Sequence, residues 1–371
     1  MATVAFRAPG KILFGAGALG SLGPEARRLG RRAVLATGRR AMAEAGVTER
    51  CLGLLAEAGV DAALFDQVEP EPDVTTVDRL REAVRAHGAD LLVGLGGGSA
   101  LDAAKAAAGL ARENEPTAVY HQGKPITRPA LPSIAIPSTS GTGSEMTPNS
   151  VLTDRRRQVK TSIRADGLIP AVAIVDPEVT LSSPPFVTAA SGVDALVQAI
   201  ESYLARGATP LTEALSVRAM EELAAALPAV VRQGEDLALR TRAAWGSAMA
   251  GLALANARLG AAHALAHPLG VWFGVPHGLA CGVLLAPVLE FNRPAAPAKY
   301  AAMERVFGGD PAAYARRLLA ECGLPAKLTD YGLTADALDP VAEETLPSGT
   351  LKANPRTATK EDLLGLLRAL I

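Results

Sequence analysis

The sequence lacks the features of a secreted, membrane-embedded or nucleic-acid-binding protein. Its three cysteines, Cys51, Cys281 and Cys322, lie far apart and are odd in number, which excludes a disulfide framework and a CxxC metal pair. Aromatic residues are only 4% of the chain, so the core must consist mainly of Ala, Val, Leu and Ile. The 37 Lys and Arg residues against 38 Asp and Glu give a formal charge of −1, too little to attract nucleic acid or anionic lipid. We therefore expect a cytoplasmic protein with no nucleic-acid partner.

The sequence also lacks a stretch with the character of a membrane span. Its first residues contain no apolar run of the kind found in signal peptides. The segment between Arg258 and Glu290 has no Asp, Glu, Lys or Arg, but it contains three histidines and three prolines. Because these residues do not suit a lipid-spanning helix, we interpret the segment as buried and functional.

Short apolar runs alternate with helical stretches in the first half of the chain. A length of 371 residues with 49% hydrophobic and 20% charged residues suggests a globular protein of two domains. The runs are apolar at every position, which is typical of strands covered on both faces. They predict a parallel, doubly wound α/β sheet with strands at 33–36, 63–65, 91–95, 134–136 and 172–175 and helices at 75–87 and 100–112.

The pattern changes near Ser182, after which strand signals nearly vanish. Ala- and Leu-rich segments with helical periodicity predict helices at 187–204, 210–227, 237–259, 311–322 and 360–370. The expected fold class is therefore α/β plus all-α. An N-terminal Rossmann-like dinucleotide-binding domain at 1–183 would be followed by an all-helical metal and substrate domain at 184–371.

Gly15-Ala16-Gly17-Ala18-Leu19-Gly20 matches the dinucleotide pattern GxGxxG, but the match is weak. The preceding strand would have only three residues, and no acidic residue ends a strand about twenty positions later. We interpret this motif as a structural turn.

A second glycine-rich loop is a stronger candidate for binding a nucleotide. The apolar run 91–95 leads into Gly96-Gly97-Gly98-Ser99, and a helix is expected to follow. Ser99 is a suitable N-cap, with Asp102 as the partner of a capping-box-like pair. Glycines let the backbone approach a phosphate, and the helix N-terminus favours the anion.

A third loop, from Pro137 to Glu145, follows the strand expected at 134–136. Its hydroxyls and exposed backbone suit a polar ligand at the carboxyl end of a strand in an open sheet. Two such loops in one sheet indicate a single nucleotide crevice, although a solvated linker would look similar.

Three of the five histidines lie within fifteen positions, at His263, His267 and His277. Asp194 and Gln198, four residues apart, share a helix face on which a lone carboxylate would be costly to bury. One carboxylate with imidazoles suits Zn²⁺ or Fe²⁺. Hydrogen-bonded core residues remain the alternative explanation, and Cys281 is expected to be a small buried hydrophobe.

Taken together, these motifs resemble the iron-containing, or group III, alcohol dehydrogenases. The resemblance spans almost the whole chain and includes GGGSALDAAK, PSTSGTGSE, GVDALVQAIESY, HALAHPLG and VPHG in this order. It implies the fold of the dehydroquinate synthase-like superfamily: an α/β dinucleotide domain, a helical domain and a metal in the cleft between them. Members of the family often form homo-oligomers, so we expect one here.

The resemblance also assigns roles to individual positions. Gly96, Gly97, Gly98, Ser99 and Asp102 would bind the cofactor pyrophosphate, Thr139, Ser140 and Thr142 would line the nicotinamide half, and Gly38, Val151 and Lys160 would make further cofactor contacts. The metal-ligand positions hold Asp194, Gln198, His263 and His277, and His267 would lie near the nicotinamide and substrate as the catalytic histidine.

Two positions depart from the family pattern. Gln198 replaces a histidine, and because an amide oxygen binds a borderline metal more weakly than imidazole does, the metal would be Fe, Zn, another divalent ion or none. Thr37-Gly38-Arg39-Arg40 lacks the carboxylate expected in members that favour NAD. Arg39 or Arg40 would then meet the 2′-phosphate of NADP, so the cofactor is NADP or NAD.

We therefore expect an NAD(P)-dependent alcohol dehydrogenase or aldehyde reductase in which a divalent metal polarises the oxygen of a small alcohol or aldehyde. His267 would relay the proton. The main alternative is a metal-independent reductase resembling maleylacetate reductase, which Gln198 favours. A dehydroquinate synthase is disfavoured because 191–200 and 259–278 contain no Lys or Arg for a phosphate substrate, and a non-catalytic role is a further alternative.

Overall fold

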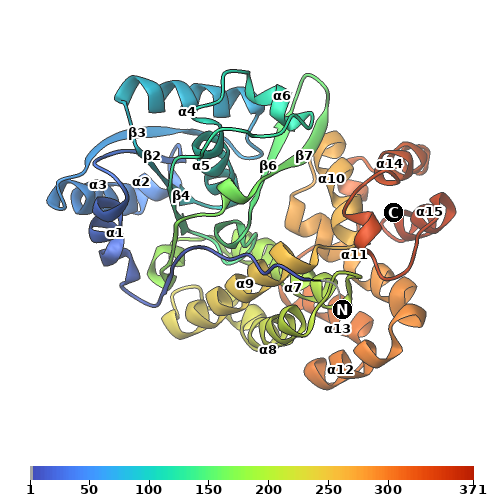
Figure 1. The fold of residues 1–371 in the computed structure, drawn as a ribbon. Coiled ribbons are helices and arrows are strands. Elements are labelled where there is room, and N and C mark those ends of the chain that lie inside the picture. The colour runs from blue at the N-terminus through green and yellow to red at the C-terminus, as the bar shows by residue number, and fades with distance from the viewer. Residues whose placement is uncertain (1–2) are drawn as a thin grey trace. The chain divides into compact units, whose positions relative to one another are not determined.

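The computed structural model describes residues 3–371, which divide into two compact units (Figure 1). The α/β unit comprises Arg7–Thr139 and Gly143–Ser183. The helical unit comprises Pro184–Ile371, Ser140–Thr142 and a short N-terminal stretch ending at Phe6. The principal change from one unit to the other lies where the sequence passes from alternating strands and helices to helices alone.

Six parallel strands form the sheet of the α/β unit, in the order β1-β8-β5-β4-β2-β3. Their bounds are β1 Ile12–Phe14, β2 Arg32–Gly38, β3 Asp61–Val68, β4 Leu91–Gly96, β5 Ser133–Pro137 and β8 Val172–Val175. The predicted parallel α/β fold and its strands are confirmed. After β2 the chain adds β3 on one side and then β4 and β5 on the other, so the strand order reverses between β2 and β4.

The helices of the α/β unit cover both faces of this sheet, which explains why its strands are apolar throughout. Val34 and Ala36 of β2 belong to a buried cluster with residues of α4 and α5, whereas Ala33 and Leu35 belong to another with residues of α1 and α3. The helices are α1 Leu22–Leu29, α2 Ala41–Glu44, α3 Val47–Glu57, α4 Val74–His87, α5 Gly98–Leu110 and α6 Thr117–His121.

An antiparallel hairpin in the α/β unit was not expected from the sequence. It consists of β6 Asn149–Asp154 paired with β7 Val159–Arg164. The two strands are mostly polar, so no apolar run marks them. Leu152 and Ile163 anchor the hairpin in the same buried cluster as α4 and α5.

The helical unit is built around a single large apolar core, and the predicted all-helical character is confirmed. Residues of α7, α10 and α11 contribute to this core together with residues of the other helices of the unit. The helices are α7 Pro185–Leu204, α8 Pro210–Arg232, α9 Leu237–Ala257, α10 Ala261–Phe273, α11 His277–Asn292, α12 Pro297–Phe307, α13 Pro311–Glu321, α14 Leu338–Thr345 and α15 Lys360–Arg368.

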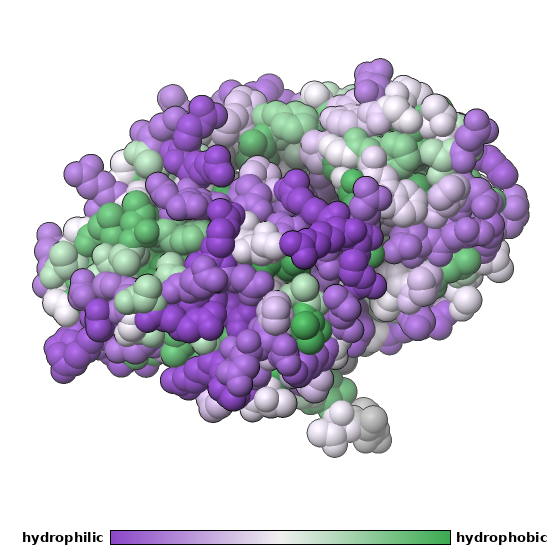
Figure 2. Space-filling view, turned by 90° about the horizontal axis from the view of Figure 1, so that it is seen from above, coloured by the Kyte–Doolittle hydropathy of each residue, from purple (hydrophilic) through white to green (hydrophobic). Residues whose placement is uncertain are grey.

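Polar side chains predominate on the face seen in Figure 2, with apolar residues in smaller groups between them. Within residues 3–371, no helix combines the length and apolar character needed to cross a bilayer. The uncharged segment before Glu290 forms α10 and α11, whose side chains are mostly buried in the helical core.

One buried carboxyl group of the α/β unit titrates near neutral pH. Burial raises the pKa of Glu145 from its ordinary value of 4.5 to about 7, against the opposing effect of Lys105. Because the folded-state pKa exceeds that of the unfolded chain, the bound proton stabilises the fold at low pH. This contribution is lost as the pH rises from about 4.5 through about 7.

We therefore expect Glu145→Gln to remove this pH dependence and to raise the free energy of unfolding above pH 7 by on the order of 3 kcal/mol relative to the unchanged chain. Denaturant unfolding followed by circular dichroism at several pH values measures the difference between the two proteins. Glu57→Gln, an exposed substitution in α3, is the control and should leave the pH dependence intact. If the free energy of unfolding depended on pH in the same way for the unchanged chain and its Glu145 variant, the prediction would be contradicted.

Candidate metal centre and nucleotide pocket

A cavity of about 630 Å³ lies at the carboxyl ends of the strands of the α/β unit. It lies at the point between β2 and β4 where the strand order reverses, the place where open α/β sheets bind ligands. Its lining comes from the segments that follow β2, β3, β4 and β5, and consists of Gly38, Arg39, Arg40, Ala41, Met42, Glu44, Val68, Glu69, Pro70, Gly96, Gly97, Ser99, Ala100 and Ser138.

The glycine-rich loop forms the turn from β4 into α5 beside this cavity. Gly96 has φ +142°, and a Cβ on it would lie 2.9 Å from the Cβ of Ala100. A Cβ on Gly94 would lie 2.9 Å from that of Ala104. Glycine is therefore required both for the turn and for the close packing of α5 on β4.

The predicted capping of α5 by Ser99 is wrong. The N-cap is Gly97, no side chain caps the helix, and Ser99 lies inside its first turn. The Ser99 hydroxyl instead accepts a hydrogen bond from the backbone N–H of Glu71 at 3.2 Å. The first N–H groups of α5 thus have no side-chain cap, and they lie beside the cavity that Gly97 and Ser99 line.

Two arginines and two glutamates are the charged residues of the cavity lining. Arg39 and Arg40 follow Gly38 at the end of β2, and both are exposed. Glu69 also lines the cavity, but its carboxylate accepts hydrogen bonds from the Thr76 hydroxyl at 2.8 Å and the Asp73 N–H at 3.0 Å. Glu44 is the other acidic residue of the lining.

Of the predicted cofactor residues, Gly38, Gly96, Gly97 and Ser99 line this cavity, whereas Gly98, Asp102, Thr139, Ser140, Thr142, Val151 and Lys160 do not. Asp102 is buried and accepts hydrogen bonds from the Val151 N–H at 2.9 Å and from the Ser144 hydroxyl, with Lys105 Nζ 3.2 Å away. Lys160 is paired with Glu71. Asp102 and Val151 thus hold β6 against α5, and their contact with a cofactor stays a prediction.

The predicted nicotinamide-side residues fall on both sides of the division between the units. Thr139 belongs to the α/β unit. Its Cγ2 and Oγ1 atoms would each lie 3.6 Å from a Cβ placed on Gly97. Ser140 and Thr142 belong to the helical unit, and a Cβ on Gly141 between them would lie 2.5 Å from the Ser191 Cβ. This close approach explains the glycine within the loop.

The first GxGxxG motif forms an internal turn. The N–H groups of Gly17 and Leu19 donate to the Asp176 carboxylate at 3.2 and 2.9 Å. Gly17 has φ +80°, which only glycine adopts readily. Asp176 occupies the N–H groups that a phosphate would need, as the structural interpretation of this motif expects.

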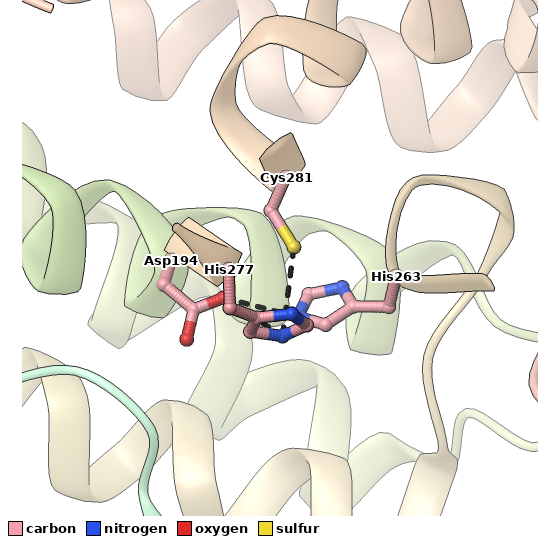
Figure 3. A group of neighbouring side chains, drawn as sticks. All are labelled: Asp194, His263, His277 and Cys281. Atoms are coloured by element: carbon pink, nitrogen blue, oxygen red, sulfur yellow. Dashed lines mark hydrogen bonds and ion pairs between the residues drawn. The ribbon is translucent and has the colours of Figure 1, made fainter. Parts of the chain in front are cut away.

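The second candidate site lies within the helical unit and joins four side chains that can ligate a metal. Asp194 of α7, His263 of α10, and His277 and Cys281 of α11 each offer an atom, and these atoms lie within 4.8 Å of one another. Figure 3 shows the carboxylate, the two rings and the thiol directed toward a common point. His263 Nε2 is 3.2 Å and His277 Nε2 is 3.9 Å from Asp194 Oδ1.

Local chain geometry brings His277 to this point. Gly274 ends α10 in the left-handed conformation, with φ +65°, and Pro276 is the N-cap of α11. His277 is the first residue of α11, so Cys281 lies one turn further along the same helix face.

Glu201 fixes the orientation of His263, and we did not predict this role. Its carboxylate accepts a hydrogen bond from His263 Nδ1 at 2.7 Å, and also from the N–H groups of Gly260 and Ala262 at 2.9 and 2.7 Å. Because Nδ1 donates to Glu201, Nε2 faces Asp194. The sequence signal was the spacing: Asp194, Gln198 and Glu201 are i, i+4 and i+7 on one helix.

Gln198 contacts the other oxygen of Asp194. Its Nε2 donates to Asp194 Oδ2 at 3.0 Å, while its buried Oε1 has no hydrogen-bond partner. Gln198 as a metal ligand stays a prediction.

His267 lies one helical turn after His263 on α10, with its ring centroid 5.8 Å from that of His277. The two predicted ligand histidines have ring centroids 5.5 Å apart. The three clustered histidines of the sequence are thus brought together in space, and His267 is less buried than His263.

The surroundings of this cluster favour the ionised carboxylate of Asp194 and the protonated imidazole of His263. Burial alone would raise the pKa of Asp194, but its hydrogen bond to His263 and the charge of His277 lower it. Burial alone would lower the pKa of His263, but Cys281, Asp194 and Glu201 raise it well above the ordinary value. A proton or a metal cation therefore stabilises the buried carboxylates.

The donor set fits a divalent transition metal. A carboxylate, two imidazoles and a thiol are ligands of Zn²⁺ and Fe²⁺, and Glu201 supports His263 as outer-sphere carboxylates support metal-binding histidines. Cys281 is buried, as expected, and its Sγ also lies within reach of the other donor atoms.

Known proteins match this sequence over almost the whole chain. The family models for iron-containing alcohol dehydrogenase and for the C-terminal region of that family match residues 9–177 and 188–371. The NAD-dependent methanol dehydrogenase of Bacillus methanolicus is 33% identical over 376 residues, which cover 98% of each protein.

Solved structures give the same result. The crystal structure of a 1,3-propanediol oxidoreductase superposes with a TM-score of 0.96 at 32% identity and covers 100% of both chains. The sulfoacetaldehyde reductase of Bifidobacterium kashiwanohense in complex with NAD⁺ superposes with a TM-score of 0.92 at 32% identity, covering 100% of this chain and 99% of that one. The chain belongs to the iron-containing alcohol dehydrogenase family.

Proposed function

We propose that this protein is an NAD(P)-dependent alcohol dehydrogenase and aldehyde reductase that transfers hydride between a small alcohol and the nicotinamide cofactor. The observation that carries the proposal is the buried cluster of Asp194, His263, His277 and Cys281 in a chain of this family. The relatives support it, since their names state activity on methanol, 1,3-propanediol and sulfoacetaldehyde.

Asp194, His263 and His277 would hold the metal. When bound, a divalent metal supplies Lewis acidity to an alcohol or carbonyl oxygen, and the nicotinamide accepts or donates the hydride. Glu201 keeps His263 Nδ1 protonated and its Nε2 directed at the cluster. His267 lies at the edge of the cluster, where its imidazole would accept the alcohol proton or return it.

The α/β unit would bind the cofactor at the cavity beside β2 and β4. The N-terminal N–H groups of α5 and the dipole of this helix would bind the pyrophosphate beside Gly97 and Gly98. Arg39 and Arg40 line the same cavity where the ribose would bind, so we propose that NADP is accepted as well as NAD.

Gln198 favours a second candidate, a metal-independent reductase of the same superfamily. In this reaction the Asp194–His263–Glu201 chain of hydrogen bonds would only hold the core together. Metal removal distinguishes the two candidates.

We also propose that the protein is cytoplasmic and forms homo-oligomers. All three of its cysteines are free thiols, which suits a reducing compartment. The resemblance to a family whose members often form homo-oligomers supports the proposed assembly. Sedimentation velocity measures the oligomeric state.

Removal of the metal should lower kcat by at least about 100-fold, because Lewis-acid stabilisation contributes several kcal/mol. The measurement is nicotinamide absorbance during oxidation of a series of small alcohols, before and after chelation and with Fe²⁺ or Zn²⁺ restored. His263→Ala should show the same loss without recovery. His87→Ala on α4 is the control and should keep its activity. Full activity after chelation and in the His263 variant would establish the metal-independent reductase instead.

His267→Ala should lower kcat by about 100-fold or more, the usual effect of removing a general acid–base. We expect its metal content to be unchanged, because Asp194, His263 and His277 remain. Steady-state kinetics and metal analysis of one preparation measure both quantities. A loss of metal in this variant, or an unchanged kcat, would contradict a proton-transfer role.

Replacing Arg39 and Arg40 together by Ala should raise the KM for NADP by about tenfold, equivalent to about 1.4 kcal/mol, and leave the KM for NAD nearly unchanged. NADP and NAD differ only in the 2′-phosphate. The change in the ratio of their KM values therefore reports how strongly the protein binds that phosphate. Arg31→Ala, at an exposed arginine outside the cavity, is the matched control. Equal changes for both cofactors would show that the arginines do not bind the 2′-phosphate.

A further inference from the structure

Cys281 occupies a place in the metal cluster that its chemistry suits. Its side chain is fully buried, and its Sγ lies 3.8 Å from His277 Nε2. Figure 3 shows the thiol directed at the imidazoles rather than into the surrounding helical core. Cys281 shares a face of α11 with His277, so a rigid element holds the two donors at i and i+4.

Gln198, the candidate on α7 for the same coordination position, has a different partner. Its Nε2 binds Asp194 Oδ2, while Asp194 Oδ1 faces His263 and His277. The amide thus holds the oxygen of Asp194 that does not contact the imidazoles. In this arrangement three ligands face Cys281, and Gln198 supports one of them.

The chemistry of the donors distinguishes this set from a site of histidines and one carboxylate. A thiolate is a soft ligand, and zinc accepts cysteine, histidine and carboxylate together. The other two cysteines do not belong to such a group: within residues 3–371, Cys281 alone lies among other potential ligands.

We propose that Cys281 Sγ is the fourth protein ligand of the metal, with Asp194, His263 and His277, and that this set binds zinc. Cys281 binds as the thiolate, and its proton passes to solvent as the sulfur–zinc bond forms. The proposal rests on the metal site of the proposed function, but it changes the ligand set and therefore the preferred metal.

X-ray absorption at the zinc edge of the zinc-loaded, cofactor-free protein tests the ligand set without an activity assay. We expect one sulfur scatterer at about 2.3 Å together with nitrogen and oxygen scatterers at about 2.0–2.2 Å. Cys281→Ser should lose the sulfur scatterer and bind zinc on the order of tenfold more weakly. Cys322→Ser, which replaces another buried cysteine of the helical unit, should retain both properties.

Gln198→Leu separates the two candidate ligands. It should keep the sulfur scatterer and change zinc affinity less than Cys281→Ser does. A nitrogen and oxygen shell without sulfur in the unchanged chain would overturn the proposal, whatever the variants do. If that zinc-loaded protein still oxidised alcohols, the proposed function would stand and only the role of Cys281 would fail. If the protein bound no metal, the metal site and the role of Cys281 would both be refuted.

Discussion

The contact between Glu201 and His263 is the constraint on which the metal cluster depends. One buried carboxylate accepts hydrogen bonds from the imidazole and from the backbone at the start of α10. It therefore sets both the path of the chain into α10 and the ring nitrogen that faces Asp194. The cost of burying Glu201 is offset by these N–H donors, which a helix N-terminus leaves without partners. A neutral isostere would accept fewer of them and would allow the ring to turn.

In the α/β unit, the close packing of α5 against the glycines of β4 is the constraint on which the nucleotide cavity depends. Gly94 and Gly96 let α5 approach β4 within a distance that no side chain would permit. The uncapped start of α5 consequently lies at the carboxyl end of the sheet, next to the segments after β2 and β3. The same backbone conformation that packs the helix also presents its N–H groups to the cavity.

Local patterns made much of this structure predictable from the sequence, and long-range contacts account for what was missed. Continuous apolar runs identified the strands, and the i, i+4 spacing identified His263 and His267. Glu201 was missed because its partners lie about sixty residues away. The β6–β7 hairpin was missed because its strands are polar, and Ser99 was assigned as a cap because its hydroxyl suits one, whereas its actual partner is Glu71.

Gln198 stands where the resemblance to the family implies a histidine, and its contact with Asp194 bears on the metal site. A histidine there would direct a ring nitrogen toward the metal, but glutamine carries a donor as well as an acceptor, and its donor binds Asp194 Oδ2. This bond leaves Asp194 Oδ1 facing the imidazoles, so the amide preserves the orientation of the carboxylate. In the arrangement that we propose, the fourth ligand role falls to Cys281, whose Sγ lies within 4.8 Å of the ligand atoms of Asp194, His263 and His277. The fourth donor would then come from α11 rather than α7, and a thiolate in that position would favour zinc over iron.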